Sequence, residues 1–530
     1  MTEAQKKRLA GAAIIVMIST ILSRITGYLR EMLIPTKLGV GMVGDAYNVA
    51  FLVPDLMYNL ILGGAIAAAL IPVLSGYIER NEEKDGWKAV GTFINITFFV
   101  MLFFCILGMV FTDKLIPIVA DGFRTKGPET QLLAIRLTRI LFPSVSFLML
   151  AGMCNGVLNS YHRFTAAAFG PVIYNLGGVL SLLLFGSSTA LGAECVAYGV
   201  MTSALIYFLF QLSVAFKNLK LYRFNIDLKH PGFIKLFKLA IPSLISSSVV
   251  QINLIISSRF ATYAAVGSVT LFNSANRTWQ LPLGIFAQSM GVALLPTLSA
   301  RLAVGDTKEY HRILMKGLKT VLLLAIPSAF AIVVLREPVI RTLFKFSTKF
   351  TEESVATAGY ILMFFSLALV SQSIVAMMTR AYFAANDTKT PLFIGSSTII
   401  INGVLSYWLF YYTPMSVAGM AIAYSISSTV YAALLILLLN RRVKGVDVKE
   451  LIMFMLKVST AALIMGLVLY PVNLVLPVDI NSKLSQAFFL GIEAVIGSII
   501  YFALVVLLRI EEGIYLINSL KSRFGRIIKV

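Results

Sequence analysis

The sequence contains few charged residues. Only 13% of its 530 residues are Asp, Glu, Lys or Arg, whereas 58% are hydrophobic and the mean hydropathy is +0.85. A soluble globular protein typically carries about 25% charged residues, so this class is excluded. Acidic residues are the scarcer kind, at 25 against 45 basic ones. We therefore expect an integral membrane protein.

Cysteine and histidine are scarce too, with three of each. Cys105, Cys154 and Cys195 fall in apolar stretches and show neither disulfide nor metal-ligand spacing. The G-x-x-x-x-G-K-[ST] motif of nucleotide-driven motors is missing, and GVGMVG at 39–44 lacks the preceding strand of a dinucleotide-binding unit. The basic residues are dispersed over short connections, which argues against a nucleic-acid partner. We expect no metal, no cofactor and no enzyme site.

Long apolar runs are what the sequence has in abundance. Runs of about 20 residues suit helices that cross roughly 30 Å of hydrocarbon, and the alternating ten-residue strands of a membrane barrel are missing from the sequence. The expected fold is an all-α integral membrane protein with about 14 transmembrane helices. The predicted spans are 9–34, 46–77, 89–112, 131–158, 166–186, 193–216, 236–263, 269–300, 316–336, 355–383, 391–412, 417–440, 450–475 and 485–508.

Lysine and arginine indicate the orientation of these spans. When the spans are counted through from the N-terminus, most basic residues fall in connections on the side of the N-terminus. Basic connections stay in the cytoplasm. Both termini should therefore be cytoplasmic.

The chain also repeats itself. AAALIPVLS at 67–75 returns as GVALLPTLS at 291–299, and GGVLSLLLF at 177–185 resembles NGVLSYWLF at 402–410. The matches keep their order and nearly the same spacing, which predicts two homologous six-helix halves in parallel orientation and two extra helices. The predicted parts are an N-terminal half at 1–217, a basic amphipathic cytoplasmic linker at 218–235, a C-terminal half at 236–440, and two helices with a basic cytoplasmic tail at 441–530.

Arginines inside apolar spans are the candidate site residues. SRITGYLREM places Arg24 and Arg30 in the first span, and Arg277 lies early in the eighth. An arginine at mid-membrane costs about 2.5 to 3.5 kcal/mol on insertion scales, so it should face a wet cavity or a partner. Guanidinium groups from both halves would form a cationic chamber suited to phosphate oxygens. The alternative is that acids such as Glu31 or Asp45 neutralise them and the arginines only hold helices together.

Several segments resemble a known family. SRITGYLREMLI, GDAYNVAFLVPDLMYNL, NGVLNSYHRFTAAAFGPVIYN, ANRTWQLPLGIFAQSMGVALLPTLSARLAVGD and ANDTKTP are similar to the MurJ family of lipid II flippases. This family belongs to the MOP exporter superfamily and is related to the MATE exporters, and the likeness spans essentially the whole chain. By motif position Arg24, Arg30 and Arg277 match the family's essential cavity arginines, and Asp45 matches its second-span aspartate.

The resemblance implies a function. A protein of this kind is a flippase of the bacterial cytoplasmic (inner) membrane that moves undecaprenyl-diphosphate-linked peptidoglycan precursor from the inner to the outer leaflet by alternating access. Its expected partners are that polyprenyl-diphosphate glycolipid and membrane lipids. We expect a monomer that works with the cell-wall synthesis machinery.

The chain departs from the family pattern at Tyr58, in DLMYNL, where the family usually places arginine. Arg259 in the seventh span would restore that charge. The expected substrate-binding residues are Arg24, Arg30, Arg277, Asp45 and Arg259. The missing arginine keeps open a flippase for another polyprenyl-diphosphate-linked glycan, such as a capsule, teichoic-type or sporulation-specific precursor. A cation-coupled drug exporter, which needs acidic cavity residues, and a scaffold without transport are further alternatives.

Overall fold

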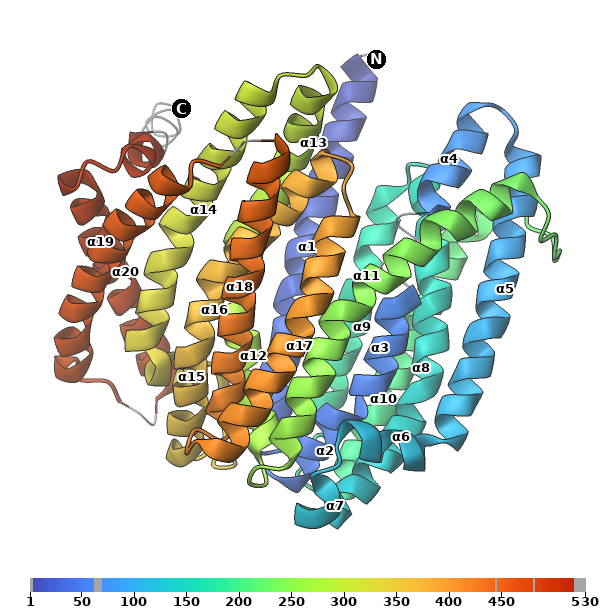
Figure 1. The fold of residues 1–530 in the computed structure, drawn as a ribbon. Helices are drawn as coiled ribbons and strands as arrows, with labels where there is room; N and C mark the ends of the chain where they lie inside the picture. Colours follow the sequence, from blue (N-terminus) through green and yellow to red (C-terminus); the bar gives the residue numbers. More distant parts are fainter. Residues whose placement is uncertain (1–2, 62–68, 444–445, 480–481, 519–530) are drawn as a thin grey trace. The chain divides into compact units, whose positions relative to one another are not determined.

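The computed structural model describes residues 3–61, 69–443, 446–479 and 482–518. Over these ranges the chain forms helices joined by turns and short connections, without a strand, so the all-α prediction is confirmed (Figure 1). The chain divides into two compact units, a first unit at Met1–Thr270 and a second unit at Leu271–Val530. The boundary falls inside one helix, α12.

The first unit is built from eleven helices and the start of α12. They are α1 (Glu3–Lys37), α2 (Met42–Ala50), α3 (Leu52–Ile61), α4 (Ile71–Glu79), α5 (Glu83–Val110), α6 (Thr112–Val119), α7 (Phe123–Lys126), α8 (Pro128–Ser160), α9 (Phe164–Phe185), α10 (Ala190–Ala215) and α11 (Pro231–Thr262).

The second unit holds the rest of α12 and the helices that follow it. They are α12 (Ser268–Pro282), the π-helix η3 (Leu283–Gln288), α13 (Ser289–Ala303), α14 (Thr307–Val334), α15 (Arg336–Phe344), α16 (Glu352–Ala384), α17 (Lys389–Tyr412), α18 (Val417–Val443), α19 (Val448–Val475) and α20 (Lys483–Leu507).

One helix occupies the middle of each unit. In the first unit α8 packs against α2, α3, α5, α9 and α10, and in the second α16 packs against α13, α14, α15 and α18. Small residues allow this close packing, as at Gly152 and Gly156, which are buried one turn apart on α8. The most apolar windows of α8 and α16 are 67% buried, against 22% for α20. The last helix therefore keeps most of its surface exposed.

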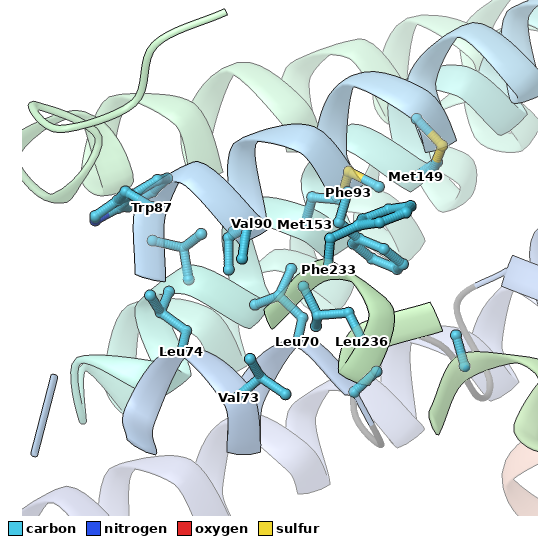
Figure 2. Packing of buried hydrophobic residues seen from close by; sticks show 14 of the residues in the cluster. Leu70, Val73, Leu74, Trp87, Val90, Phe93, Met149, Met153, Phe233 and Leu236 are labelled. Carbon is cyan, nitrogen blue, oxygen red and sulfur yellow. The ribbon is translucent and has the colours of Figure 1, made fainter. Parts of the chain in front are cut away.

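A hydrophobic cluster joins four helices of the first unit. Figure 2 shows Trp87 of α5 on the same side of the cluster as Leu74 of α4, and Phe93 of α5 beside Phe233 of α11 and Met153 of α8. Trp87 is 1% exposed, and its indole N–H donates to the hydroxyl oxygen of Tyr161 at 2.9 Å. By these contacts α11, the predicted seventh span, packs with helices of the first unit.

Eleven helices in the described ranges are long and apolar enough to cross a membrane. They coincide with eleven of the predicted spans. The spans predicted at 9–34, 46–77 and 236–263 are not among the eleven, so the total of 14 stays a prediction. Within 46–77 the structure has three short helices, with a turn at Phe51 between α2 and α3, and residues 62–68 lie outside the described ranges.

The connection before α11 is held by polar contacts. Its residues 219–229 form no helix. Asn225 donates from Nδ2 to the Lys88 carbonyl oxygen at 3.0 Å and accepts on its own carbonyl a bond from Asn95 Nδ2 at 2.8 Å. Because both partners lie on α5, this part of the predicted linker follows that helix. The basic tail predicted beyond 518 lies outside the described residues.

Candidate functional site

The first candidate arginines lie on α1, one face of which packs against α9. Ser23, Gly27 and Arg30 succeed one another on that face at helical spacing. Asn175 of α9 donates from Nδ2 to the Ser23 carbonyl oxygen at 3.2 Å, and a Cβ on Gly27 would lie 3.1 Å from the same nitrogen. A Cβ on Gly178 would lie 2.8 Å from Cδ of Arg30. Glycines on both helices therefore make room for the polar side chains between them.

The Arg30 side chain contacts Glu31 and Tyr174 and is partly exposed elsewhere. Its Nη2 lies 3.2 Å from Glu31 Oε1, and its guanidinium carbon lies 5.5 Å from the ring centroid of Tyr174 on α9. The side chain remains 20% exposed. An arginine has five N–H donors in a planar fork, so the contact with Glu31 leaves most of them for another acceptor. Arg30 is a positioned cation.

Arg24 has a different environment. It is exposed and, in the described part of the chain, forms no ion pair or hydrogen bond. Six residues separate it from Arg30, which places the two about 120° apart around a helix. α1 continues without a break through Gly27. The structure thus gives Arg24 and Arg30 no shared protein partner and points them to different sides of α1.

Asp45 is buried in a helix cap. It is 1% exposed, and its carboxylate accepts the N–H of Gly267 at 2.6 Å, the N–H of Thr270 at 2.9 Å and the Thr270 hydroxyl at 2.7 Å. These donors belong to the start of α12, where unsatisfied N–H groups favour a carboxylate. Gly267 has φ +95°, which glycine adopts without strain. Asp45 therefore fixes the start of the helix that carries Arg277.

Arg259, near the end of α11, pairs with an acid at the surface. Its Nη2 lies 3.7 Å from Asp121 Oδ2, which also accepts the hydroxyl of Tyr263 at 2.6 Å. The Arg259 side chain is 46% exposed. This contact joins the end of α11 to the turn before α7. Arg259 thus forms a partly exposed ion pair within the first unit.

Arg277 lies in the second unit, on α12. The opposite side of that helix is anchored by Trp279, which is 2% exposed and stacks on Phe365 of α16 with ring centroids 5.9 Å apart. Trp279 also donates from its indole nitrogen to Asn276 Oδ1 at 2.9 Å. With these residues buried, the exposed stripe of α12 carries Arg277 and Leu281. Arg277 thus belongs to the second unit, and the arginines of α1 belong to the first.

Sequence reasoning missed two residues beside Arg30. Tyr174 supplies the ring under its guanidinium, and Gly178 gives space to its stem. Both lie in segments singled out for other reasons, the motif FGPVIYN and the repeat GGVLSLLLF. Tyr58 flanks the same small hydrophobic cluster as Tyr174, around Leu148 and Tyr207. Nothing in the local sequence indicates these contacts, because they join separate helices.

Comparison with protein families decides what kind of chain this is. The family model described as lipid II flippase MurJ matches residues 34–486. The chain belongs to the MurJ family. A MurJ relative, named a probable lipid II flippase, from Buchnera aphidicola subsp. Acyrthosiphon pisum is 30% identical over 458 residues, covering 86% of this chain and 89% of the relative. The lipid II flippase MurJ of Burkholderia cenocepacia is 29% identical, covering 80% of this chain and 82% of the relative.

Solved structures agree with membership of the MurJ family. A lipid II flippase MurJ in an inward closed conformation matches with TM-score 0.78 and 26% identity, covering 94% of this chain and 99% of the other. An inward-facing multidrug resistance transporter of the MATE family, in the MOP superfamily, matches with TM-score 0.67 and 17% identity, covering 81% and 98%. The second match shows a shared fold alone. Its family and its eleven apolar helices together identify this chain as a multi-pass membrane protein.

Proposed function

We propose that this protein is a flippase for lipid II, the undecaprenyl-diphosphate-linked peptidoglycan precursor, and moves it from the inner to the outer leaflet by alternating access. Family membership over residues 34–486 carries the proposal. Relatives that are 28 to 30% identical over most of their length are named lipid II flippases or probable ones. The substrate crosses without covalent change, so the protein is a transporter and no enzyme.

Three arginines are proposed to hold the diphosphate. Arg30 offers a guanidinium that is fixed by α9 yet still partly exposed. Arg24 and Arg277 are exposed on helices of the first and second units. Guanidinium groups bind phosphate oxygens through paired N–H bonds. The polyprenyl tail stays in the bilayer while the sugar and peptide pass through the protein.

The proposed topology places both termini in the cytoplasm and the protein, as a monomer, in the bacterial inner membrane. Two related halves at 1–217 and 236–440, joined by the basic linker and followed by two helices, support alternating access. The distribution of Lys and Arg over the connections supports the orientation. A reporter fused to the C-terminus that is active only in the periplasm should stay inactive. Activity of that reporter would reverse the orientation.

The membrane potential supplies a driving force. With the inside negative, each negative charge moved outward gains about 2.3 kcal/mol per 100 mV. We expect net outward transport of a fluorescent lipid precursor by the reconstituted protein to fall when the potential is collapsed. Unchanged transport would rule out this coupling while leaving the flippase activity itself intact.

Complementation of a flippase-depleted cell tests the site. Arg24→Ala, Arg30→Ala and Arg277→Ala should each abolish rescue, because each removes a guanidinium proposed to bind the diphosphate. Arg312→Ala is the matched control, since Arg312 is exposed on α14 and pairs with Glu309 at 2.6 Å. Normal growth with one of the first three variants would remove that residue from the site.

A second candidate substrate is another polyprenyl-diphosphate-linked glycan. Tyr58 favours it, because this residue flanks the cluster that also carries Tyr174, the ring beside Arg30, and brings no charge there. Strains depleted of different glycolipid flippases separate the two substrates. Rescue of the peptidoglycan strain alone supports lipid II, whereas rescue of a capsule or teichoic-type strain alone supports the second candidate.

A further inference from the structure

A cavity of about 510 Å³ lies in the second unit, where α15 and α20 pack together beside the ends of α14 and α19. The candidate arginines of α1, α11 and α12 do not line it. Its walls combine apolar side chains such as Leu474 and Leu490 with the charged residues Arg336, Glu337 and Glu493. A cavity with both apolar walls and a few convergent polar groups is typical of ligand sites.

Glu493 is the least expected of these residues. It lies about 15 Å along α20 from the first residue of the helix and is 2% exposed. Its Oε1 atom is buried and finds no hydrogen-bond partner in the described part of the chain. An ionisable residue inside a membrane helix is costly unless it is paired, and such residues mark ligand or ion sites. Gln486 and Leu490 continue the same face of α20 along the cavity wall.

Arg336 provides the opposite charge. At the start of α15, its Nη1 donates to the Val333 carbonyl oxygen at 3.2 Å and lies 3.8 Å from the sulfur of Met363. It has no carboxylate partner among the described residues. Arg341, which also lines the cavity, is different because its Nη2 lies 2.8 Å from Glu352 Oε2. Within the described residues, the cavity therefore holds an acid, Glu493, and a guanidinium, Arg336, neither of which has an ionic partner.

We propose that this cavity binds the headgroup of a phospholipid that carries a primary amine, of the phosphatidylethanolamine type. The ammonium would donate to the orphaned oxygen of Glu493, and the phosphate would accept from the free N–H groups of Arg336. The apolar wall at Leu474 and Leu490 suits the glycerol and the first acyl carbons. A choline headgroup has no N–H to donate, and a glycerol headgroup has no positive charge. Both should therefore bind more weakly.

Lipid competition on the purified full-length protein tests this proposal. The protein is exchanged into nanodiscs with equal amounts of phosphatidylethanolamine, phosphatidylcholine and phosphatidylglycerol of identical acyl chains, and retained lipids are counted by native mass spectrometry. Loss of one charge-assisted hydrogen bond changes affinity by about tenfold. We expect the ethanolamine lipid to be retained about tenfold over the others and Glu493→Gln to remove this preference. Glu353→Gln, at an exposed acid on α16, should leave it unchanged.

Several outcomes would overturn the proposal. Equal retention of the three lipids would do so, as would a preference for phosphatidylglycerol or an ethanolamine preference that survives in Glu493→Gln. Leu490→Trp is a second variant, which fills the cavity and leaves the carboxyl group in place. If Glu493→Gln does not yield folded protein, loss of the preference in Leu490→Trp supports the cavity, and its persistence refutes it.

Discussion

Replacing Asp45 should destabilise the start of α12 and lower the stability of the first unit. Asp45→Ala removes the acceptor of three donors, the N–H groups of Gly267 and Thr270 and the Thr270 hydroxyl, at a site that is 1% exposed. Each buried donor left without a partner costs roughly 1 kcal/mol or more. One substitution removes all three bonds, because they share the Asp45 carboxylate. We therefore expect the stability to fall by about 3 kcal/mol. Asp45→Asn keeps one acceptor oxygen and should lose about half as much.

Thiol reactivity during heating measures this loss. The chain has three free cysteines, of which Cys105 and Cys154 are buried, so a thiol-reactive dye reports unfolding. For a unit of the size of Met1–Thr270, a loss of about 3 kcal/mol corresponds to a midpoint lower by roughly 5 °C. All variants must be heated at one rate, because membrane proteins of this size unfold irreversibly. Asp55→Ala is the matched control, since Asp55 is an exposed acid in the first turn of α3.

Two results would contradict this reasoning. A midpoint for Asp45→Ala within about 1 °C of the parent would show that the cap contributes little. Loss of cellular rescue by Asp45→Asn at an unchanged midpoint would place Asp45 among the substrate-binding residues, as the motif match predicts. The experiment therefore separates a structural role from a binding role.

Three further substitutions test the geometry around the arginines. Gly178→Ala places a methyl group 2.8 Å from Cδ of Arg30 and should lower transport by roughly tenfold. Gly403 is the equivalent position of the second repeat, and a Cβ there would have no neighbour within 4 Å. Gly403→Ala should therefore leave transport unchanged. Tyr174→Leu removes a cation–π contact worth about 0.5 to 2 kcal/mol, so it should weaken substrate binding in a lipid-retention assay. Normal binding by this variant would show that the ring is dispensable. Arg259→Ala breaks an exposed ion pair worth at most about 1 kcal/mol, so the variant should rescue growth fully. Failed rescue at normal stability would indicate that Arg259 belongs to the substrate-binding site.

The candidate site was only partly predictable from sequence. Arg24, Arg30 and Arg277 stand out because a charge inside an apolar run is visible without any structure. The same rule also selected Arg259, which pairs with Asp121 in the folded chain. The sequence shows that a charged residue is present, but it does not show which side chain of another helix lies opposite that residue. For Asp45, the motif match and the observed cap lead to different roles.

The sequence by itself determined the membrane class, the helical fold, the repeat and the family. Each of these follows from hydrophobic runs and local motifs, whose effect depends on neighbours in the chain. The tertiary structure decided what each charged side chain meets. Asp45 accepts a bond from Gly267 across 222 positions, Tyr174 lies under Arg30 from another helix, and Glu493 lines a cavity. Such partners depend on how helices pack, because a hydrogen bond acts only over a few ångströms. Separation along the chain gives no measure of that distance.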